Sequence, residues 1–354
     1  MESNELKKKN IQTSREEIDY GSVNLRKVAV IGCGVWGRNI VRNFYNLNVL
    51  DTVCDIDEEN LKKVTEQYPG VKVTKDFHEI INNKEITGVC VVTPSHTHYK
   101  MVKAMLEAGK NVYVEKPIST VAAEARDLSQ LAHDKGLVLM VGHLLLYHPA
   151  VNRLKMLIEE GALGKIVYAQ SDRLNVNYFK NDRSVMWDLA PHDVSMISYV
   201  TGKEPLHVIS AVGCSSDQNE IMDITHIGIQ FEDGVIGHIS DSWITPRKHV
   251  QLLVRGTKAT AILDDTVAEN KLVIFDNFVK DNTQNIKLDY LEIEPLKLEC
   301  QHFISCCATG KKARSDGDNG FMVTQILEEA EKIMLGDKVK KLDEVNFALS
   351  RTKK

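Results

Sequence analysis

Two short stretches of the sequence carry side chains that could move a proton. Lys116 lies between Glu115 and Pro117, directly after the apolar run 111–114. A lysine in a partly desolvated cleft beside a positive charge can have a lowered pKa and exchange protons near neutral pH. Pro117 restricts the backbone before it and favours an extended Lys116. Loop lysines are more often only solvated, so the residues alone leave catalysis by Lys116 as one of two interpretations.

The second stretch is Trp187-Asp188-Leu189-Ala190-Pro191-His192-Asp193. A proline in a helical pattern is most often the first helical residue, which predicts that His192 lies in the first turn of a helix. The helix dipole would there lower the pKa of the histidine and leave a neutral imidazole that accepts a proton. Asp188 or Asp193 could orient that ring. The alternative is that Asp193 only satisfies the helix start while His192 packs beneath a loop.

A glycine-rich turn predicts a bound dinucleotide, beside which Lys116 and His192 would act. The segment Gly32-Cys33-Gly34-Val35-Trp36-Gly37 has the spacing G-x-G-x-x-G, after a strand-like run and before a helical pattern. In a dinucleotide site the first glycine permits the tight turn and the second lets the backbone approach the pyrophosphate. The third allows close packing of helix on strand, with the helix amides facing the anion. This context makes the pattern more specific than the three glycines alone.

Asp55 and Ile56 follow the second predicted strand, and Asp55 lies 55 − 32 = 23 residues after Gly32. A carboxylate at this distance accepts hydrogen bonds from the adenosine ribose hydroxyls and repels a 2′-phosphate. The sequence therefore predicts NAD rather than NADP. The alternatives are that Asp55 is a solvated turn residue or that Asp57 takes over its role.

Short strand and helix patterns alternate through residues 26–146, which is typical of βαβ units and a parallel sheet. The predicted strands are 27–31, 49–54, 71–74, 89–92, 111–114 and 137–141. The helices predicted between them are about 36–47, 58–67, 76–81, 97–108 and 120–136, the last capped by Ser119 or Thr120. Lys116 would then lie at the carboxyl edge of the sheet, where open α/β folds bind ligands.

After Pro149 the pattern changes to many strands with few helices. The predicted strands are 166–174, 207–212, 224–231, 235–243, 250–255, 259–263, 271–275 and 286–293, and the predicted helices are 151–160, 295–308 and 320–334. Several strands alternate apolar and polar residues, and Asp233-Gly234 is a hairpin signal. These features predict an α/β fold class, in which a Rossmann domain precedes an α/β domain with a large open, mainly antiparallel sheet.

Composition excludes several classes of function. The chain has 354 residues, 43% of them hydrophobic and 26% charged, with a net charge of −5, so no basic surface indicates nucleic acid. Its longest apolar runs are too short to span a membrane, and residues 1–9 contain no apolar core of a signal peptide. The seven scattered cysteines suggest reduced thiols. We therefore expect a cytoplasmic protein without nucleic-acid or membrane partners.

Two groups of residues could suggest a metal site, and the spacing disfavours both. Cys300, His302, Cys306 and Cys307 lack paired C-x-x-C spacing and lie in an apolar helical pattern, which favours buried structural thiols. A zinc dehydrogenase would draw on the histidines His96, His98, His143, His148 and His192. His96 and His98 are wrongly spaced for one helix face and no cysteine joins them, so we expect no metal.

Four segments resemble the glucose–fructose oxidoreductase / inositol dehydrogenase (Gfo/Idh/MocA) family. They are the glycine turn 32–37, Thr93-Pro94-Ser95-His96-Thr97-His98, the segment 108–117 that ends in Glu-Lys-Pro, and Asp188-x-x-x-His192. The resemblance implies a Rossmann domain and a second domain whose open sheet mediates oligomerisation. We therefore expect a charged extension over 1–24, an NAD-binding domain over 25–146 and a substrate-binding and oligomerisation domain over 147–354, in a homodimer or homotetramer.

The resemblance also implies roles for the matching residues. Lys116, Asp188 and His192 correspond to the catalytic residues of the family, and Thr93-Pro94 with Glu-Lys-Pro flanks the nicotinamide. The cofactor-binding residues expected are Gly32, Cys33, Gly34, Val35, Trp36, Gly37, Asp55, Ile56, Thr93, Pro94, His98, Glu115 and Lys116. The substrate-binding residues expected are Lys116, His143, Tyr147, Arg173, Asn175, Asn177, Trp187 and His192.

Within the family the chain looks most like the nucleotide-sugar branch. Segments 142–150, 189–193 and 294–303 resemble a subgroup that includes UDP-N-acetylglucosamine 3-dehydrogenases, which oxidise a sugar 3-hydroxyl on the way to a 2,3-diamino sugar of lipid A. The guanidinium of Arg173 suits a phosphate, although a surface-facing polar strand is an equal alternative for this residue and its neighbours. One departure is His249-Val250-Gln251, where relatives often carry another basic residue.

The sequence thus leads us to expect NAD-dependent oxidation of a sugar secondary hydroxyl, most specifically the 3-hydroxyl of UDP-N-acetylglucosamine. His192 would take the hydroxyl proton, and Lys116 would stabilise the developing alkoxide, or the two would exchange these roles. A keto-sugar reductase would use the same residues in reverse, and an inositol or free-sugar dehydrogenase would need no diphosphate site. A regulator without catalysis would be expected to lack Lys116 or His192, and both are present.

Overall fold

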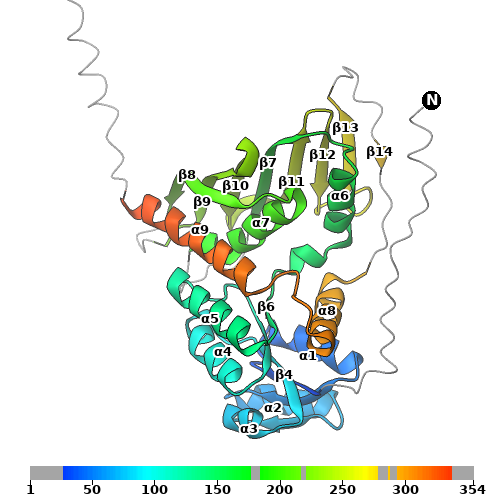
Figure 1. The fold of residues 1–354 in the computed structure, drawn as a ribbon, viewed down its shortest axis with the longest axis vertical. Helices are drawn as coiled ribbons and strands as arrows, with labels where there is room; N and C mark the ends of the chain where they lie inside the picture. The colour runs from blue at the N-terminus through cyan, green and yellow to red at the C-terminus, as the bar shows by residue number, and fades with distance from the viewer. Residues whose placement is uncertain (1–26, 177–183, 217–220, 278–285, 288–292, 337–354) are drawn as a thin grey trace, which may run out of the picture.

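The computed structural model describes residues 27–176, 184–216, 221–277, 286–287 and 293–336. Two sheets organise this part of the chain: a parallel sheet near the N-terminus and a larger mixed sheet after it, with helices packed on both (Figure 1). The predicted α/β class is therefore confirmed. Asn177, the extension 1–24 and part of the predicted strand 286–293 lie outside the described residues.

The parallel sheet has six strands in the order β3-β2-β1-β4-β5-β6. Its strands are β1 (Lys27–Ile31), β2 (Leu50–Cys54), β3 (Lys72–Thr74), β4 (Ile86–Val91), β5 (Asn111–Val114) and β6 (Leu139–Val141). Alternate residues of β1 enter different cores: Val28 and Val30 pack on one face, and Ala29 and Ile31 on the other. Because both faces are covered, the central strands are continuous apolar runs. The strand order reverses between β1 and β4, which is where such sheets bind dinucleotides.

Helices cover both faces of this sheet. They are α1 (Gly37–Asn46), α2 (Glu58–Gln67), α3 (Phe77–Asn82), α4 (His98–Glu107) and α5 (Ala122–Lys135). Asp57 and Asp76 cap α2 and α3 by accepting hydrogen bonds from the amides two residues ahead, at 2.9 Å each. The apolar residues of α1 and α2 pack on one face of the sheet, and those of α3, α4 and α5 pack on the other.

The second sheet has eight strands in the order β14-β13-β12-β11-β7-β10-β9-β8. Its strands are β7 (Ile166–Val176), β8 (Pro205–Cys214), β9 (Ile224–Phe231), β10 (Ile236–Ser242), β11 (Ile244–Gly256), β12 (Ala259–Asp264), β13 (Leu272–Asp276) and β14 (Ile286–Lys287). The pairs are antiparallel except for β7 with β10. The expectation of a large, mainly antiparallel sheet is confirmed.

Helices α6 (Pro149–Glu159), α7 (Val185–Thr201) and α9 (Gly317–Gly336) cover one face of the second sheet (Figure 1). Residues such as Ala169, Ile239 and Leu252 point from the strands into this core. Because side chains alternate along a strand, Ser171, Arg173 and Asn175 of β7 share the face of Ala169. The polar residues that follow Ala169 on β7 therefore lie on the helix-covered side of the sheet.

Helix α8 (Pro295–Thr309) returns to the first domain and lies beside α1 (Figure 1). Phe303 packs edge-on against Phe44 of α1, with ring centroids 6.3 Å apart. A Cβ atom on Gly88 would lie 3.2 Å from the Phe303 ring, so glycine in β4 gives that ring room. The chain therefore crosses between the two sheets several times rather than once.

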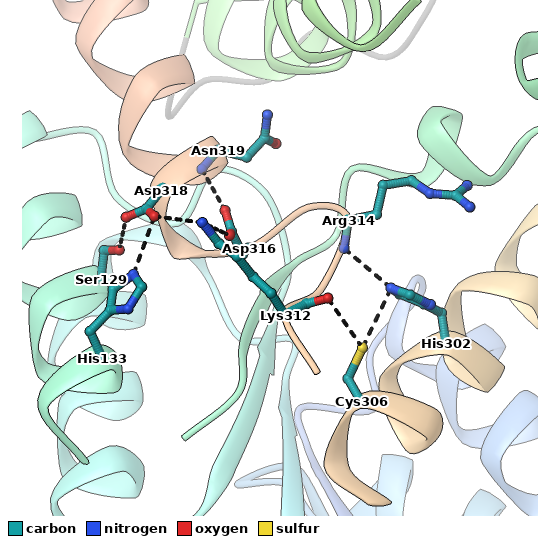
Figure 2. Close-up of polar contacts among 9 residues, drawn as sticks. All are labelled: Ser129, His133, His302, Cys306, Lys312, Arg314, Asp316, Asp318 and Asn319. Atoms are coloured by element: carbon teal, nitrogen blue, oxygen red, sulfur yellow. Dashed lines mark hydrogen bonds and ion pairs between the residues drawn. The ribbon is translucent and has the colours of Figure 1, made fainter. Parts of the chain in front are cut away.

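Figure 2 shows how the start of α9 is fastened to the N-terminal domain. Asp318 accepts hydrogen bonds from Ser129 at 2.6 Å and from Lys312 at 2.9 Å, and it contacts His133 at 3.2 Å. Ser129 and His133 belong to α5, one turn apart, so a single carboxylate of α9 joins two helices of different domains. Burial alone would raise the pKa of the Asp318 carboxyl. The hydrogen bonds outweigh that effect and lower this pKa to about 2.

Several element boundaries differ from those that the sequence predicts. Helix α5 begins at Ala122 because the Ser119 hydroxyl bonds to Glu124 and to the amide of Val121, so Ser119 organises the turn before the helix. The helix predicted over 97–108 is α4 (His98–Glu107), and a 3₁₀ turn (Ser95–Thr97) precedes it. Helix α7 is longer than the local pattern around Pro191 predicts, and that difference changes the description of the site. None of the helices in the described residues is long and apolar enough to cross a membrane.

Candidate active site

The glycine turn between β1 and α1 leaves its backbone open in the way the sequence predicts. Gly32 has φ +93°, and a Cβ atom there would lie 2.6 Å from the carbonyl oxygen of Val92, so a side chain is excluded. A Cβ atom on Gly37 would strike the carbonyl of Gly32, which shows how closely helix and turn pack. Nothing lies within 4 Å of the Cβ position of Gly34. That open space above Gly34 suits the close approach of a pyrophosphate.

The Asp55 carboxylate lies against this turn. Its oxygens accept hydrogen bonds from the amide of Cys33 at 2.7 Å and from the amide of Asp57 at 2.9 Å. Val35 of the glycine turn and Ile56, the residue after Asp55, are 89% and 86% exposed. Two exposed aliphatic side chains beside a fixed carboxylate suit an adenine ring and its ribose. Burial and the nearby Asp55 charge raise the pKa of the Cys33 thiol to about 12, so this cysteine stays protonated.

Trp36 and Glu115 connect the glycine turn to the end of β5. The Trp36 indole donates to Oε1 of Glu115 at 2.7 Å, and the Tyr113 hydroxyl donates to the same oxygen at 3.0 Å. Burial raises the pKa of Glu115, and the bonds from Trp36 and Tyr113 oppose that rise. A Cβ atom on Gly142, after β6, would lie 2.9 Å from the Tyr113 oxygen and 3.0 Å from Glu115. Glycine at position 142 therefore leaves the space that this network occupies.

Lys116 reaches from the first domain to helix α7 of the second. Its amine donates to the main-chain oxygen of Asp188 at 2.5 Å and lies 3.3 Å from the Asp188 carboxylate. The peptide between Lys116 and Pro117 is cis. Only 17% of the Lys116 side chain is exposed, so the amine is largely withdrawn from water. The Glu-Lys-Pro segment and the Asp188-x-x-x-His192 segment, far apart in sequence, thus meet at one place.

His192 lies in the interior of α7, because Pro191 is inside that helix rather than at its start. The prediction that His192 lies in the first turn is therefore wrong, and the helix dipole does not act on it, since that effect fades beyond the first turn. Its pKa is nevertheless well below the usual value, through burial and then through the positive charges of Lys116 and Arg173 and the nearby His143. His192 is therefore a neutral base, as the sequence predicts, but burial rather than the helix dipole is the main cause.

Neither aspartate orients the His192 ring through Nδ1. That nitrogen is buried and has no hydrogen-bond partner among the described residues. Asp193 instead accepts from Arg173 at 3.1 and 3.0 Å and from Ser171 at 2.6 Å. Asp188 and His192 are four residues apart, so both face the same side of α7, toward Lys116.

His143 is a second buried histidine near Lys116. Burial, and then the charge of Lys116, lower its pKa to about 3, so the ring is neutral at ordinary pH. Both of its ring nitrogens are buried without a hydrogen-bond partner among the described residues. Unpaired polar atoms of this kind are costly unless something else pairs with them. A substrate hydroxyl between His143 and His192 would satisfy that need.

The remaining expected site residues have varied surroundings. Thr93 and Thr97 share a hydrogen bond of 2.6 Å, and the His98 ring bridges the Thr93 and Pro117 carbonyls. Trp187 donates to Glu331 of α9 at 2.8 Å, and Tyr147 lies under Arg314. Pro94 follows β4 and is exposed, and Asn175 lies near the end of β7. Trp187 and Tyr147 are thus tied to the C-terminal part of the chain.

Sequence analysis missed Asp241, which lies beside Arg173 in the register of β10 with β7. Burial, and then the neighbouring Asp193 charge, raise its pKa well above the usual value. One sequence signal was available, since Ile239 and Asp241 occupy the same face of β10 and Ile239 is in the core. A polar residue at a core-facing position of a strand indicates a buried network. No group of three metal-ligating side chains occurs within the described ranges.

Comparison with known proteins assigns this arrangement to a family. Residues 26–143 match the family described as "Oxidoreductase family, NAD-binding Rossmann fold", and residues 151–262 match the "GFO/IDH/MocA C-terminal domain". A myo-inositol 2-dehydrogenase of Thermotoga maritima is 25% identical over 339 residues, covering 90% of this chain and 99% of the relative. A UDP-N-acetylglucosamine 3-dehydrogenase of Acidithiobacillus ferrooxidans is 27% identical over 222 residues, covering 61% of this chain and 66% of the relative.

Solved structures share the fold. That of the A. ferrooxidans UDP-N-acetylglucosamine 3-dehydrogenase superposes with a TM-score of 0.78 at 22% identity, covering 88% of this chain and 98% of the other. A levoglucosan dehydrogenase in complex with NADH and levoglucosan gives a TM-score of 0.78 at 19% identity, covering 88% and 97%. The glycine cradle and Asp55 fit the same dinucleotide. The chain is an NAD-binding oxidoreductase of the Gfo/Idh/MocA family, whose relatives include dehydrogenases of sugar and inositol hydroxyls.

Proposed function

We propose that this protein oxidises a secondary hydroxyl of a nucleotide sugar, and specifically the 3-hydroxyl of UDP-N-acetylglucosamine. The observation that carries the proposal is the meeting of Lys116 with Asp188 on the face of α7 that also bears His192. Groups from two domains meet at the carboxyl edge of the NAD-binding sheet, where a substrate can contact both. An enzyme with this arrangement can hold a sugar hydroxyl between a base and a cation.

In the proposed mechanism His192 accepts the hydroxyl proton. Its pKa is held well below the usual value, so the ring is neutral and ready to act as a base at physiological pH. Lys116, already fixed by Asp188, donates a hydrogen bond to the same oxygen and stabilises the developing alkoxide. When bound, NAD supplies the acceptor for the carbon-bound hydrogen. Asp188 keeps the Lys116 amine in place, so little reorganisation is needed during the reaction.

A diphosphate would need cations that are not already neutralised. Arg247 and Lys248 are exposed on the stretch of β11 where its register with β7 is interrupted, level with Asn175. Because both side chains are exposed, an anion can approach either of them. These two side chains, rather than Arg173, are our candidates for the diphosphate.

A second candidate is a dehydrogenase of inositol or a free sugar. The observation that favours it is the pairing of Arg173 with Asp193, which neutralises the cation that the sequence suggested for phosphate. The 25% identity to a myo-inositol 2-dehydrogenase over almost its whole length is consistent with this candidate. The other expected site residues serve either substrate equally, since both reactions begin at a secondary hydroxyl.

Turnover separates the two candidates. Purified protein is mixed with NAD and, in separate reactions, with UDP-N-acetylglucosamine, other UDP- and dTDP-sugars, myo-inositol and free sugars, while the absorbance of the reduced cofactor is followed. We expect reduction with UDP-N-acetylglucosamine and binding of UDP alone by calorimetry. Turnover only with inositol or free sugars, without UDP binding, would exclude the nucleotide-sugar proposal and favour the second candidate.

A further inference from the structure

His98 makes an unusual pair of contacts at the edge of the cofactor site. It is the first residue of α4, and its side chain is nearly inaccessible, with 1% exposed. Nε2 lies 2.7 Å from the carbonyl oxygen of Thr93, and Nδ1 lies 2.8 Å from the carbonyl oxygen of Pro117. One imidazole therefore bridges the segments that follow β4 and β5, next to the position where the strand order reverses.

The two partners of this ring determine its protonation. A carbonyl oxygen can only accept a hydrogen bond, and a neutral imidazole has a single N–H to donate. Both contacts of His98 are hydrogen bonds only if both nitrogens carry a proton, which makes the ring an imidazolium. Separations of 2.7 and 2.8 Å are those expected of charge-assisted N–H···O bonds. Two carbonyl dipoles pointing at the ring stabilise its positive charge away from water.

We propose that His98 is a permanently charged clamp that positions the Thr93 and Lys116 segments and places a positive charge behind the nicotinamide site. The proposal rests on the proposed function in one respect, because it needs NAD to bind against these two segments. Oxidised nicotinamide is cationic and reduced nicotinamide is neutral. A fixed positive charge nearby therefore disfavours NAD relative to NADH and helps hydride uptake. His98 is a positioning residue here, since it acts through its neighbours and its charge.

The same charge bears on the direction of the reaction. Lys116 and His98 both lie beside the Lys116–Pro117 peptide, since the Lys116 amine contacts Asp188 and His98 contacts the Pro117 carbonyl. Two positive charges around one peptide favour the neutral reduced cofactor over the cationic oxidised one. The arrangement thus favours oxidation of the substrate over reduction of a keto-sugar.

A first experiment observes the protonation of His98 directly. The full-length protein is labelled with ¹⁵N-histidine, and ring nitrogen spectra are recorded at pH 8 for the wild type and for His98→Gln, which assigns the His98 signals by their loss. His96→Gln is the matched control, because His96 is an exposed histidine two residues earlier in the chain. We expect both His98 nitrogens to carry protons. A spectrum of a neutral tautomer for His98 would overturn the proposal.

A second experiment separates the electrostatic effect of the His98 charge from its structural role as a bridge between two segments. Dissociation constants for NAD and NADH are measured by calorimetry on the wild type, His98→Gln and His96→Gln. A glutamine amide can still bond a carbonyl but carries no charge, so the ratio Kd(NAD)/Kd(NADH) should fall about threefold or more in His98→Gln only. If both constants weaken equally, His98 acts only as a structural bridge and the charge is excluded. Failure of the wild type to bind NAD would instead contradict the function on which the proposal rests.

Discussion

At the scale of single residues, the site consists of charges that are paired and bases that are not. Lys116 is held by Asp188, and Arg173 by Asp193. Within the described part of the chain, both ring nitrogens of His143 and Nδ1 of His192 have no hydrogen-bond partner, and burial keeps both rings neutral. Ion pairs in a desolvated site cost free energy to break, so the cations stay where they are. A neutral imidazole can accept a proton, whereas a paired ammonium or guanidinium cannot. This division assigns the proton to histidine and the electrostatic stabilisation to lysine.

Replacing His192 by glutamine should remove the base without removing the cofactor site. We expect kcat/KM to fall about 10²- to 10⁴-fold while the dissociation constant of NAD changes less than about threefold, because the change removes proton transfer alone. Steady-state kinetics with the substrate that the turnover panel identifies, and calorimetry with NAD, test this. His78→Gln, which changes an exposed histidine of α3, is a matched control. Near-normal turnover in His192→Gln would remove this residue from the mechanism.

The pH dependence of the reaction provides a separate test of His192. Its pKa lies well below the usual histidine value, chiefly through burial, so the ring remains neutral when the pH falls to about 6. The kcat/KM profile should therefore stay flat between about pH 8 and pH 6 rather than decline through the usual histidine range. Buffer-matched rate measurements over that interval decide the matter. A decline centred near the usual histidine pKa would show that burial does not keep the base neutral.

At the scale of elements, the sequence predicts the helices and strands that depend on neighbouring residues alone. Strands β1, β5 and β6 and the glycine turn were predicted because apolar runs, turn glycines and strand order are encoded over short stretches. Pro191 was misassigned because a proline is tolerated inside α7 when the rest of that long helix packs against the sheet. The partners of Asp193 and Lys116 were unpredictable for a related reason. The Lys116–Asp188 contact depends on how the two sheets are placed, whereas the contacts of Asp193 depend on how α7 packs on β7 of its own sheet. No spacing in the sequence specifies either arrangement.

Gly142 tests the network between the ends of β5 and β6. A Cβ atom there would lie 2.9 Å from the Tyr113 hydroxyl and 3.0 Å from Glu115, so alanine must displace both side chains. We expect Gly142→Ala to lower the free energy of unfolding by about 1–3 kcal/mol and to weaken NAD binding about tenfold. Urea unfolding and calorimetry measure the two effects. Gly336→Ala, where nothing lies within 4 Å, is the control, and equal behaviour of the two variants would contradict this account.

At the scale of the whole molecule, α8 and the start of α9 hold the two sheets in one relative position. Arg314 lies over the rings of Tyr147 and Tyr199 at 4.9 and 5.3 Å, and its guanidinium donates to the carbonyl of Leu146. Asp318 joins α9 to α5 through the contacts shown in Figure 2. The Lys116–Asp188 contact depends on this relative position. The C-terminal helices therefore help to assemble the site although they contribute no candidate catalytic residue.

The contribution of Asp318 should appear in the acid stability of the protein. Its folded pKa of about 2 lies below the usual aspartate value, so its stabilisation is present above about pH 4 and is lost as the pH falls toward 2. Since the side chain is half exposed, Asp318→Asn should cost only about 1 kcal/mol or less at pH 7. Urea unfolding at pH 7 and pH 3 measures this, with Asp134→Asn on α5 as control. A difference from wild type that does not shrink at the lower pH would contradict it.

The outer face of the second sheet bears on the oligomeric state that we propose. Edge strand β8 exposes three large apolar side chains, Leu206, Ile209 and Val212, at 58%, 47% and 58%, while Val208 and Ala211 of the same strand are buried in the core. Neighbouring exposed apolar groups on an edge strand favour contact with another surface. We propose that this face joins copies of the chain into a dimer or tetramer.

Sedimentation velocity tests this proposal over a range of protein concentrations. The wild type should sediment as a dimer or larger, whereas the double variant Leu206→Lys/Val212→Lys should shift toward the monomer, because two charges would be desolvated at the contact. Met156→Lys is the control, since Met156 is 41% exposed on α6, which packs on β12 toward the other edge of the sheet. Circular dichroism verifies that each variant is folded. A wild type that stays monomeric at every concentration would exclude an interface on this face, and an assembly that survives both lysines would place the interface elsewhere.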